Sequence, residues 1–282
     1  MSTPRPRREL LAKELVRVRD LAGVSGRELA RRMKETRPEL KASQGTISRI
    51  ENGQVLPQLP VVRAWLELCG ADDPTRKRIL ELAEAAHGET RPWRELLREE
   101  RHLQGVARER ETAAVRVRNF QPTVVPGLLQ TPEYAANLIP LADVTAATEH
   151  DAAVAERVAR QQVLYDEGRR FQFVLTEHVL RWAPGPRSLL TAQLDRIASL
   201  AKLDTVDVAV VPVEAPVLVP WHNFVIWEPV DGAPFVTTEL VHGEQELHDP
   251  EQVALYGELW DRMWAASAVG DAAVERIQDA KP

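Results

Sequence analysis

Residues 43–53 constrain the fold of this chain more than any other stretch, because they carry both the start and the stop of a short helix. Ser43 is a hydroxyl residue of the kind favoured at a helix N-cap, and Gly53 suits the left-handed conformation that follows a helix end. Ile47 and Ile50 are three residues apart, so both can face a core. The opposite face then consists of polar side chains: Gln44, Thr46, Ser48, Arg49 and Asn52.

The polar face of this predicted helix has the chemistry that reads DNA bases. A glutamine can bond bidentately to adenine, an arginine to guanine, and a serine or threonine to a base edge or a phosphate. An ordinary surface helix more often carries Glu and Lys. A second helix precedes this one, because Ser25 and Glu28 form the capping-box pattern S-x-x-E and Leu29 and Met33 follow at core spacing.

These two helices resemble the helix-turn-helix of the phage-repressor, or XRE, family. In that family the second helix lies in the major groove, with its first residues at the bases and its far end at the backbone. The resemblance implies that Gln44 is the leading base contact and Arg49 the second. It places four further residues nearer the phosphates: Ser43, Thr46, Ser48 and Asn52.

Two features depart from the family pattern. Gly45 stands where relatives often have a reading side chain, so base readout can be sparse. The connector from Lys34 to Ala42 contains Pro38 and is longer than a simple turn, which leaves the angle between the two helices open. An ordinary helical hairpin with a polar face is the alternative interpretation.

Apolar spacing on both sides of the motif predicts three more helices. The first ends near Gly23, the fourth ends at Gly70, and the fifth starts at Asp73-Pro74. The stripe of the first helix consists of Leu11, Leu15, Val18 and Leu21. Five short helices within residues 1–88 are enough to bury one small core.

Charge divides the chain at the same place. Residues 1–88 hold 17 of the 36 Lys and Arg and 12 of the 42 Asp and Glu, a net charge of +5, against −11 for residues 89–282. Phosphate contact explains a basic N-terminal region, with Arg31 and Lys41 as contacts beside the motif, although a solvated face explains any one of these residues. The expected partner is double-stranded DNA.

Length and composition exclude several classes. A chain of 282 residues with 44% hydrophobic residues suits about two folded domains. No run of about 18 uncharged apolar residues and no signal-type N-terminus is present, so we expect a cytoplasmic, nucleoid-associated protein without membrane insertion. The lone cysteine, Cys69, cannot form an internal disulfide and is expected to be a buried structural thiol.

Apolar residues recur at near-heptad spacing from Trp93 to Phe120, which predicts a long or twice-broken helix after a boundary near residues 87–92. We interpret residues 89–120 as a helical linker. Its stripe can pack on its own chain or on a second copy, and the sequence does not choose between them. We favour a homodimer, because helix-turn-helix proteins usually bind paired half-sites.

Residues 121–282 mix helical and alternating patterns, which predicts an α+β domain for effector or partner binding. Helices are expected at 149–165 and 188–203 and from Asp249 onward, and strands at 171–175, 206–211, 224–227 and 235–240. The whole chain is then mainly α, with a small β-sheet of underivable strand order.

A second resemblance centres on Val125-Pro126-Gly127-Leu128-Leu129-Gln130-Thr131. This run is similar to the hallmark of the C-terminal domain of actinobacterial XRE regulators encoded beside a small acidic partner protein. The resemblance implies such a partner for this chain, and an antitoxin-like role is one form of it. The residues themselves indicate a turn at Pro126-Gly127 and a helix capped by Thr131, for which a structural role suffices.

Chemical motifs are weak in the acidic region. Glu177 and His178 end a predicted strand, and a second group lies between a strand and a helix: His242, Glu244, Glu246, His248 and Asp249. The histidine spacing is not that of a helical zinc site, so we interpret the second group as a solvated polar loop. Core packing is the better interpretation of Trp182, Trp221 and Trp227, with a pocket wall as the alternative. We therefore expect no enzyme activity, cofactor or metal, although a DNA-tethered hydrolase remains the alternative of another class.

Overall fold

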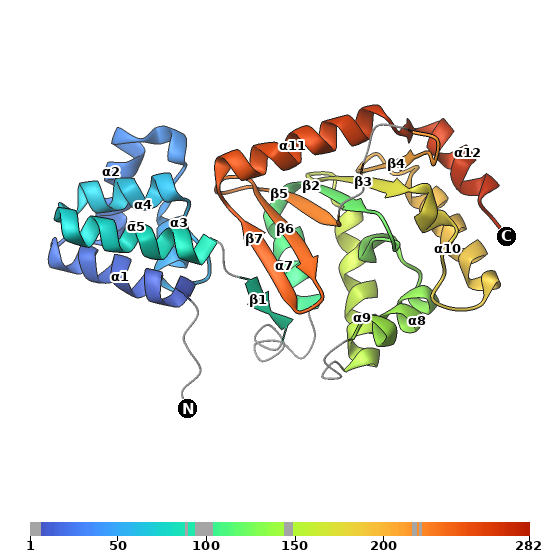
Figure 1. Ribbon diagram of the computed structural model, residues 1–282, viewed down its shortest axis with the longest axis horizontal. Helices are drawn as coiled ribbons and strands as arrows, with labels where there is room; N and C mark the ends of the chain where they lie inside the picture. Colours follow the sequence, from blue (N-terminus) through green and yellow to red (C-terminus); the bar gives the residue numbers. More distant parts are fainter. Residues whose placement is uncertain (1–6, 88–89, 94–103, 144–148, 216–218, 220–221) are drawn as a thin grey trace. The chain divides into compact units, whose positions relative to one another are not determined.

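The computed structural model describes residues 7–87, 90–93, 104–143, 149–215, 219 and 222–282 (Figure 1). The chain divides into two compact units. Unit 1 consists of Met1–Thr90 with the segments Pro229–Phe235 and Gln245–Val253, and unit 2 consists of Arg91–Glu228, Val236–Glu244 and Ala254–Pro282. Each unit has its own core and is described by itself.

Five helices make up residues 7–87 of unit 1, as the apolar spacing predicts. They are α1 (Arg7–Leu21), α2 (Gly26–Thr36), α3 (Gln44–Glu51), α4 (Leu59–Leu68) and α5 (Asp73–His87), with a single 3-10 turn, η1 (Pro38–Leu40), between α2 and α3. The predicted caps form, since Ser25 accepts a hydrogen bond from the Glu28 amide at 3.2 Å. Gly23, Gly53 and Gly70 all have φ between 64° and 68°, which favours glycine after a helix.

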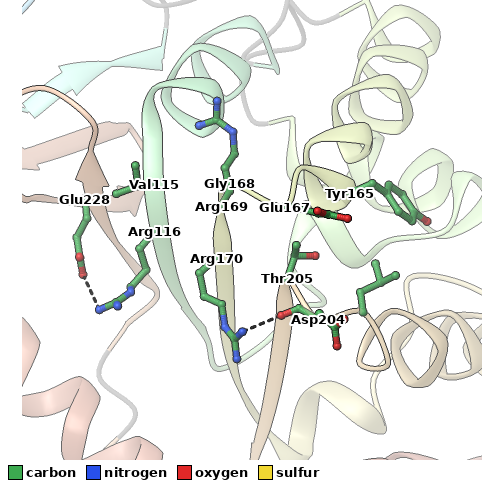
Figure 2. A pocket seen from close by; sticks show the side chains of 11 residues that line it. Val115, Arg116, Tyr165, Glu167, Gly168, Arg169, Arg170, Asp204, Thr205 and Glu228 are labelled. Carbon is green, nitrogen blue, oxygen red and sulfur yellow. Dashed lines mark hydrogen bonds and ion pairs between the residues drawn. The ribbon is translucent and has the colours of Figure 1, made fainter.

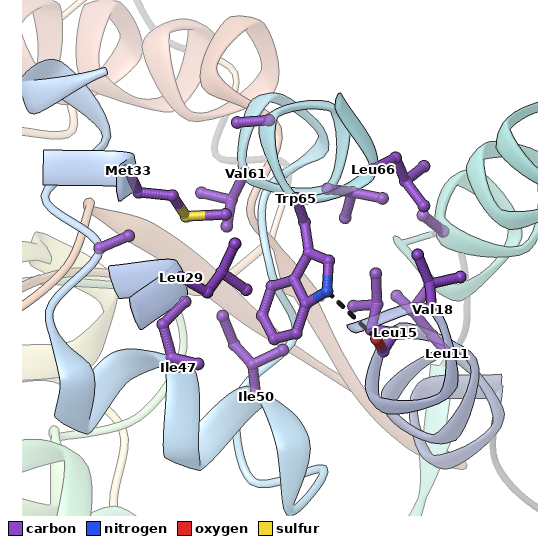
Figure 3. Close-up of a cluster of buried hydrophobic side chains, with 14 of the residues drawn as sticks. Leu11, Leu15, Val18, Leu29, Met33, Ile47, Ile50, Val61, Trp65 and Leu66 are labelled. Atoms are coloured by element: carbon purple, nitrogen blue, oxygen red, sulfur yellow. Dashed lines mark hydrogen bonds between the residues drawn. The ribbon is translucent and has the colours of Figure 1, made fainter. Parts of the chain in front are cut away.

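The core of unit 1 is arranged around Trp65 of α4, whose side chain has no exposed surface (Figure 3). Its Nε1 donates a hydrogen bond to the Leu15 carbonyl of α1 at 3.1 Å, so the indole is satisfied while buried. Leu29 and Ile50 bring α2 and α3 against the same ring. One aromatic side chain thus joins four helices.

Two predictions for this core are corrected. Leu21 is 78% exposed, because α1 ends there and the last turn of its stripe has no helix to pack against. Cys69 is only half-buried, at the C-cap of α4, and burial raises the pKa of its thiol.

Unit 2 carries most of an eight-stranded sheet, counted over the strands that the structure describes, in the order β1-β7-β6-β5-β2-β3-β4-β8. Its strands are β1 (Thr90–Pro92), β2 (Ala114–Gln121), β3 (Arg170–Thr176), β4 (Val206–Val211), β5 (Phe224–Pro229), β6 (Phe235–Leu240), β7 (Gly243–Leu247) and β8 (Ala268–Val269). β2, β3 and β4 are parallel, and Arg116 lies opposite Arg170 in their register. Helices cross between these strands, as parallel pairing requires.

The described helices that accompany this sheet pack partly on it and partly on one another (Figure 1). They are α7 (Gln104–Ala113), α8 (Pro132–Ala142), α9 (His150–Arg160), α10 (Arg187–Leu200), α11 (Pro250–Ala265) and α12 (Asp271–Asp279), with the 3-10 turns η2 (Gly127–Leu129), η3 (Gln161–Tyr165) and η4 (Glu177–Leu180). The mainly helical composition and the α+β second domain are confirmed. The sheet is larger than the small sheet we predicted.

The predicted helix from Trp93 to Phe120 is wrong at its C-terminal end. Residues 114–121 form strand β2 in the interior of the sheet, where Val117 and Phe120 are buried. The spacing of three between Ala114, Val117 and Phe120 imitates a helix, but these residues pack within the sheet. The stripe from Trp93 to Phe120 is therefore not one continuous dimer surface. Its positions 94–103 lie outside the described residues.

The polar group at 242–249 is not a solvated loop. Glu244 and Glu246 belong to strand β7, and the side chains of Glu244 and His248 are buried. Charged residues on a strand disguise it in the sequence, since strand prediction relies on β-branched and aromatic residues.

No helix in the part of the chain described here is long and apolar enough to cross a membrane. Within the same residues, no group of three or more His, Cys, Asp and Glu side chains is placed to hold a metal ion.

Candidate nucleic-acid interface

A half-buried arginine, Arg19, fixes α3 against the rest of unit 1. Arg19 of α1 binds the Glu51 carboxylate at the end of α3 and donates to the Val24 carbonyl at 2.8 Å, just before α2. Its side chain is only 14% exposed, so this ion pair is shielded from solvent more than the surface pairs are. Together with the apolar contacts of Ile47 and Ile50, it sets the orientation of α3.

The start of α3 is capped by its own hydroxyl groups. The Ser43 side chain accepts a hydrogen bond from the Thr46 amide at 3.1 Å, and the two hydroxyl oxygens lie 3.0 Å apart. This satisfies one of the amides that a helix N-terminus leaves free. Ser43 and Thr46 are thus committed to the cap, where a phosphate would meet them together with the remaining amides.

The face of α3 away from the core carries the predicted DNA-reading residues. Gln44, Ser48 and Asn52 are exposed, whereas Arg49 is half-buried. The Nε of Arg49 is buried and has no hydrogen-bond partner among the described residues. The side chain of Arg49 is therefore partly packed against unit 1 and partly open to solvent.

Gln44 has a charged neighbour on α2, one of the basic residues around the motif. The Arg27 Nε, on the first turn of α2, lies 3.5 Å from the Gln44 Oε1. An exposed cation at the N-terminus of α2 is well placed to orient the amide of Gln44 and to meet a phosphate. The signal in the sequence was the position of Arg27 two residues after the Ser25 cap.

The two predicted phosphate contacts differ in their surroundings. Arg31 is engaged by Glu28 and Glu35 on its own helix, each at 2.7 Å, and these hydrogen bonds raise its pKa and lower that of Glu28 to about 2. Lys41 is exposed in the left-handed conformation, with φ 47°. Arg31 would have to exchange carboxylates for a phosphate, so Lys41 is the more available cation.

The run Val125–Thr131 in unit 2 is held by buried glutamines. Gln193 accepts from the Thr131 amide at 2.8 Å and donates to the Leu129 carbonyl at 2.7 Å. Gln161 donates to the Gln130 carbonyl at 2.7 Å, and the Gln130 side chain donates to the Val125 carbonyl. These bonds satisfy the backbone of a buried turn, as burial demands. The predicted turn and the Thr131 cap are confirmed.

Two of the candidate catalytic carboxylates, Glu177 and Glu244, are engaged in structural contacts. Glu177 accepts from the Val213 amide at 3.0 Å and from Arg181, whose hydrogen bond does most to lower its pKa. Glu244 binds Arg110 through both carboxylate oxygens at 2.7 Å. Of the three tryptophans, Trp227 is buried and donates to Thr237, Trp182 is half-buried, and Trp221 lies outside the described residues.

A cavity of about 780 Å³ opens at the amino ends of β2, β3 and β4 in unit 2 (Figure 2). Arg116 and Arg170 stand side by side there. Carboxylates already pair with both cations, Glu228 at 3.7 Å from Arg116 and Asp207 at 2.6 Å from Arg170. The charges of this cavity therefore largely compensate one another.

Comparison with known families agrees with this geometry. Residues 10–79 match the model of a helix-turn-helix domain, so unit 1 carries the fold of a DNA-binding regulator. Residues 104–279, more than half of the chain, match a family described as "Domain of unknown function (DUF5753)". The chain belongs to that family. No curated protein and no solved structure matches it.

Proposed function

We propose that this protein is a sequence-specific transcriptional regulator of the XRE type that reads its operator with α3. The observation that carries the proposal is the rigidly held α3, which turns Ile47 and Ile50 into the core and presents Gln44 and Arg49 at its polar face. The basic charge of residues 1–88 supports phosphate contact. Cytoplasmic residence on the nucleoid follows from this role.

Replacing the two reading side chains tests the recognition helix. We expect Gln44→Ala and Arg49→Ala each to weaken binding to the cognate operator by about 1–3 kcal/mol, because each removes a base contact. Lys41→Ala should weaken operator and random DNA alike and reduce the salt dependence of binding, because a phosphate contact carries no base information. Titration of the full chain with labelled operator and with random duplex measures both effects.

Arg31→Ala extends this comparison to the ion-paired arginine, and it too should weaken binding of operator and random DNA alike. Equal binding of operator by the parent, Gln44→Ala and Arg49→Ala proteins would show that α3 does not read the bases. Circular dichroism of each variant establishes that the fold is retained. Both reading residues have exposed or half-buried side chains, so their loss leaves the core of unit 1 intact.

We further propose that the second domain controls DNA binding through a small ligand or a small acidic partner protein. The antitoxin-like function is the form of this proposal in which a neighbouring gene encodes the partner. Support comes from the division of the chain into two compact units, one with the helix-turn-helix and one with an independent core. A mobility shift of upstream DNA, with and without the adjacent small protein, tests this control.

A homodimer is the assembly we propose, because a two-fold protein binds half-sites about one helical turn apart, roughly 34–36 Å. The end of the apolar stripe belongs to strand β2 and lies in the sheet. The proposal of a dimer therefore rests on the general geometry of helix-turn-helix proteins. Sedimentation at micromolar concentration should give twice the 31.6 kDa chain mass. A monomer that protects a single half-site would exclude the dimer.

We propose a non-enzymatic role for the second domain. The contacts of Glu177 and Glu244 support it, since arginines already engage both carboxylates. A screen of the full chain against hydrolase and nucleotide substrates, with and without zinc, tests this. Turnover that Glu177→Gln or His178→Ala removes would establish the hydrolase alternative.

A further inference from the structure

Two arginines of unit 2 stand out because their charge is poorly compensated. Arg157 and Arg160 lie three residues apart on α9, so both face the same side of the helix. That side contacts Gly127 and Gln130 of the Val125–Thr131 run. The proposed DNA interface uses neither arginine.

Arg157 is hydrogen-bonded only to neutral groups among the described residues. Its Nη1 donates to the Gln130 Oε1 at 2.7 Å, and its Nε donates to the Gln104 Oε1 at 3.1 Å. No carboxylate in the described part of the chain forms an ion pair with it. Glu239 and Glu111 act on Arg157 without forming an ion pair with it, so its desolvation is costly and this arrangement favours a bound anion.

Arg160 has one carboxylate partner and one unused donor. Its Nη1 donates to the Glu111 Oε1 at 2.6 Å, with side chains that are 8% and 5% exposed. The Arg160 Nε and the Glu111 Oε2 are buried, and neither has a hydrogen-bond partner among the described residues. Buried polar atoms left unpaired call for an explanation, and a missing ligand is one.

Gly127 allows the Arg160 guanidinium to approach the backbone. A Cβ added at this glycine would lie 2.6 Å from the Arg160 Nη2 and 3.5 Å from the Arg157 Nε. Any other residue would push the Arg160 guanidinium out of this position. The glycine therefore brings both guanidiniums to the same short segment of main chain.

We propose that Arg157 and Arg160, packed against Gly127, form the anion-binding element of a ligand site in unit 2. The ligand is a small molecule that carries a carboxylate or a phosphate group, since arginine forks recognise both through paired hydrogen bonds. If the second domain controls DNA binding as proposed, the effector is an anion of this class. The anion site itself does not depend on that proposal.

The surrounding carboxyl groups support an anion rather than a fixed internal ion pair. Burial raises the pKa of Glu111 to about 7 despite the nearby arginines, so its negative charge is only partly present at neutral pH. Desolvation, followed by Glu244, raises the pKa of Glu239. Glu239 is nevertheless an exposed residue, so water reaches part of it although its carboxyl group is desolvated.

Direct titration of the full chain with two probes tests the site. We expect inorganic phosphate or succinate, added at constant ionic strength and pH 8, to bind saturably with one site per chain in isothermal titration calorimetry. Arg157→Gln and Arg160→Gln should each weaken binding by at least about tenfold. Each variant loses a hydrogen bond between charged groups, and such a bond contributes more to binding than a tenfold change in affinity requires. The probe that binds identifies the anion as phosphate or carboxylate.

Three control variants separate this site from other cations. Arg108→Gln removes an exposed arginine that pairs with Glu156, and it should leave anion binding unchanged. Lys41→Ala should also leave it unchanged, although it weakens DNA binding, so the two proposals fail independently. Glu111→Gln should tighten anion binding at pH 8, because it removes the negative charge that competes for Arg160.

The site is rejected if neither probe binds saturably to the parent protein. Binding that Lys41→Ala abolishes would place the anion at the DNA interface instead. Should Arg157→Gln fail to fold, Glu111→Gln still decides, since a purely structural arginine pair gives no reason for tighter binding. Unchanged affinity in both Arg160→Gln and Glu111→Gln would overturn the assignment.

Discussion

Replacing Trp65 with alanine should destabilise unit 1 by about 3–5 kcal/mol, the range for deleting a large buried aromatic side chain. The indole is fully buried and meets residues of α1, α2 and α3, so no single neighbour can collapse into the space it leaves. The variant also removes the hydrogen bond that the indole adds to the Leu15 carbonyl of α1. In the full chain, hydrogen exchange of amides in residues 7–87 should accelerate by about two to three orders of magnitude, and operator binding should be lost.

Two control variants show how much of the lost stability comes from the volume and the hydrogen bond of Trp65. Trp65→Phe keeps most of the volume but removes the hydrogen bond to Leu15, and it should cost about 1–3 kcal/mol for the lost hydrogen bond and the smaller ring. Leu21→Ala changes a residue that is 78% exposed and should stay within about 0.5 kcal/mol of the parent. A Trp65→Ala protein with parental exchange rates would mean that the helices do not share one core.

The fold of unit 1 could be predicted almost completely because its signals are local. Ser25 and Ser43 cap helices through bonds within three residues, and Gly53 and Gly70 end them through their own backbone conformation. Leu21 was misjudged because periodicity extends a stripe beyond the point where a neighbouring helix ends.

Strand β2 shows why unit 2 was harder to predict. Its apolar residues recur at intervals of three, and only pairing with β3 and β5, which are distant or later in the chain, makes it a strand. Strand β7 was not predicted for a related reason. Its buried Glu244 is paired with Arg110 of helix α7, which is far away in the sequence. Tertiary context decided both segments, and no local pattern carries that information.

The polar network around the Val125–Thr131 run was equally beyond the sequence. Gln130, Gln161 and Gln193 resemble ordinary surface residues until the fold brings their amides to one turn. Arg27 is similar in the candidate DNA interface, because its approach to Gln44 depends on the packing of α2 on α3. Sequence patterns single out α3 as the proposed recognition helix, while its supporting contacts follow from the packing.

Glu111→Gln should remove a pH-dependent loss of stability from unit 2. The pKa of Glu111 is about 7 in the folded chain because burial opposes its charge, against 4.5 for the free side chain. Since the folded value is the higher one, the protonated carboxyl stabilises the fold fully below about pH 4.5 and this contribution is lost as the pH rises through 7. One pKa unit corresponds to about 1.36 kcal/mol, so the whole loss amounts to about 3 kcal/mol.

Burial sets the sign of this prediction, and the arginines that face Glu111 act against it. Arg157 and Arg160 of α9 favour its charge, Glu239 of β6 lies near the same arginines, and Arg169 binds the Glu111 carbonyl rather than its carboxylate. Urea unfolding of the full chain across the range from about pH 4.5 to 8.5, resolved by hydrogen exchange in α7 and α9, measures the effect. The stability of these helices should fall with pH in the parent and in the exposed control Glu109→Gln, and much less in Glu111→Gln. Parallel pH profiles for Glu111→Gln and the parent would mean that Arg160 keeps Glu111 ionised throughout.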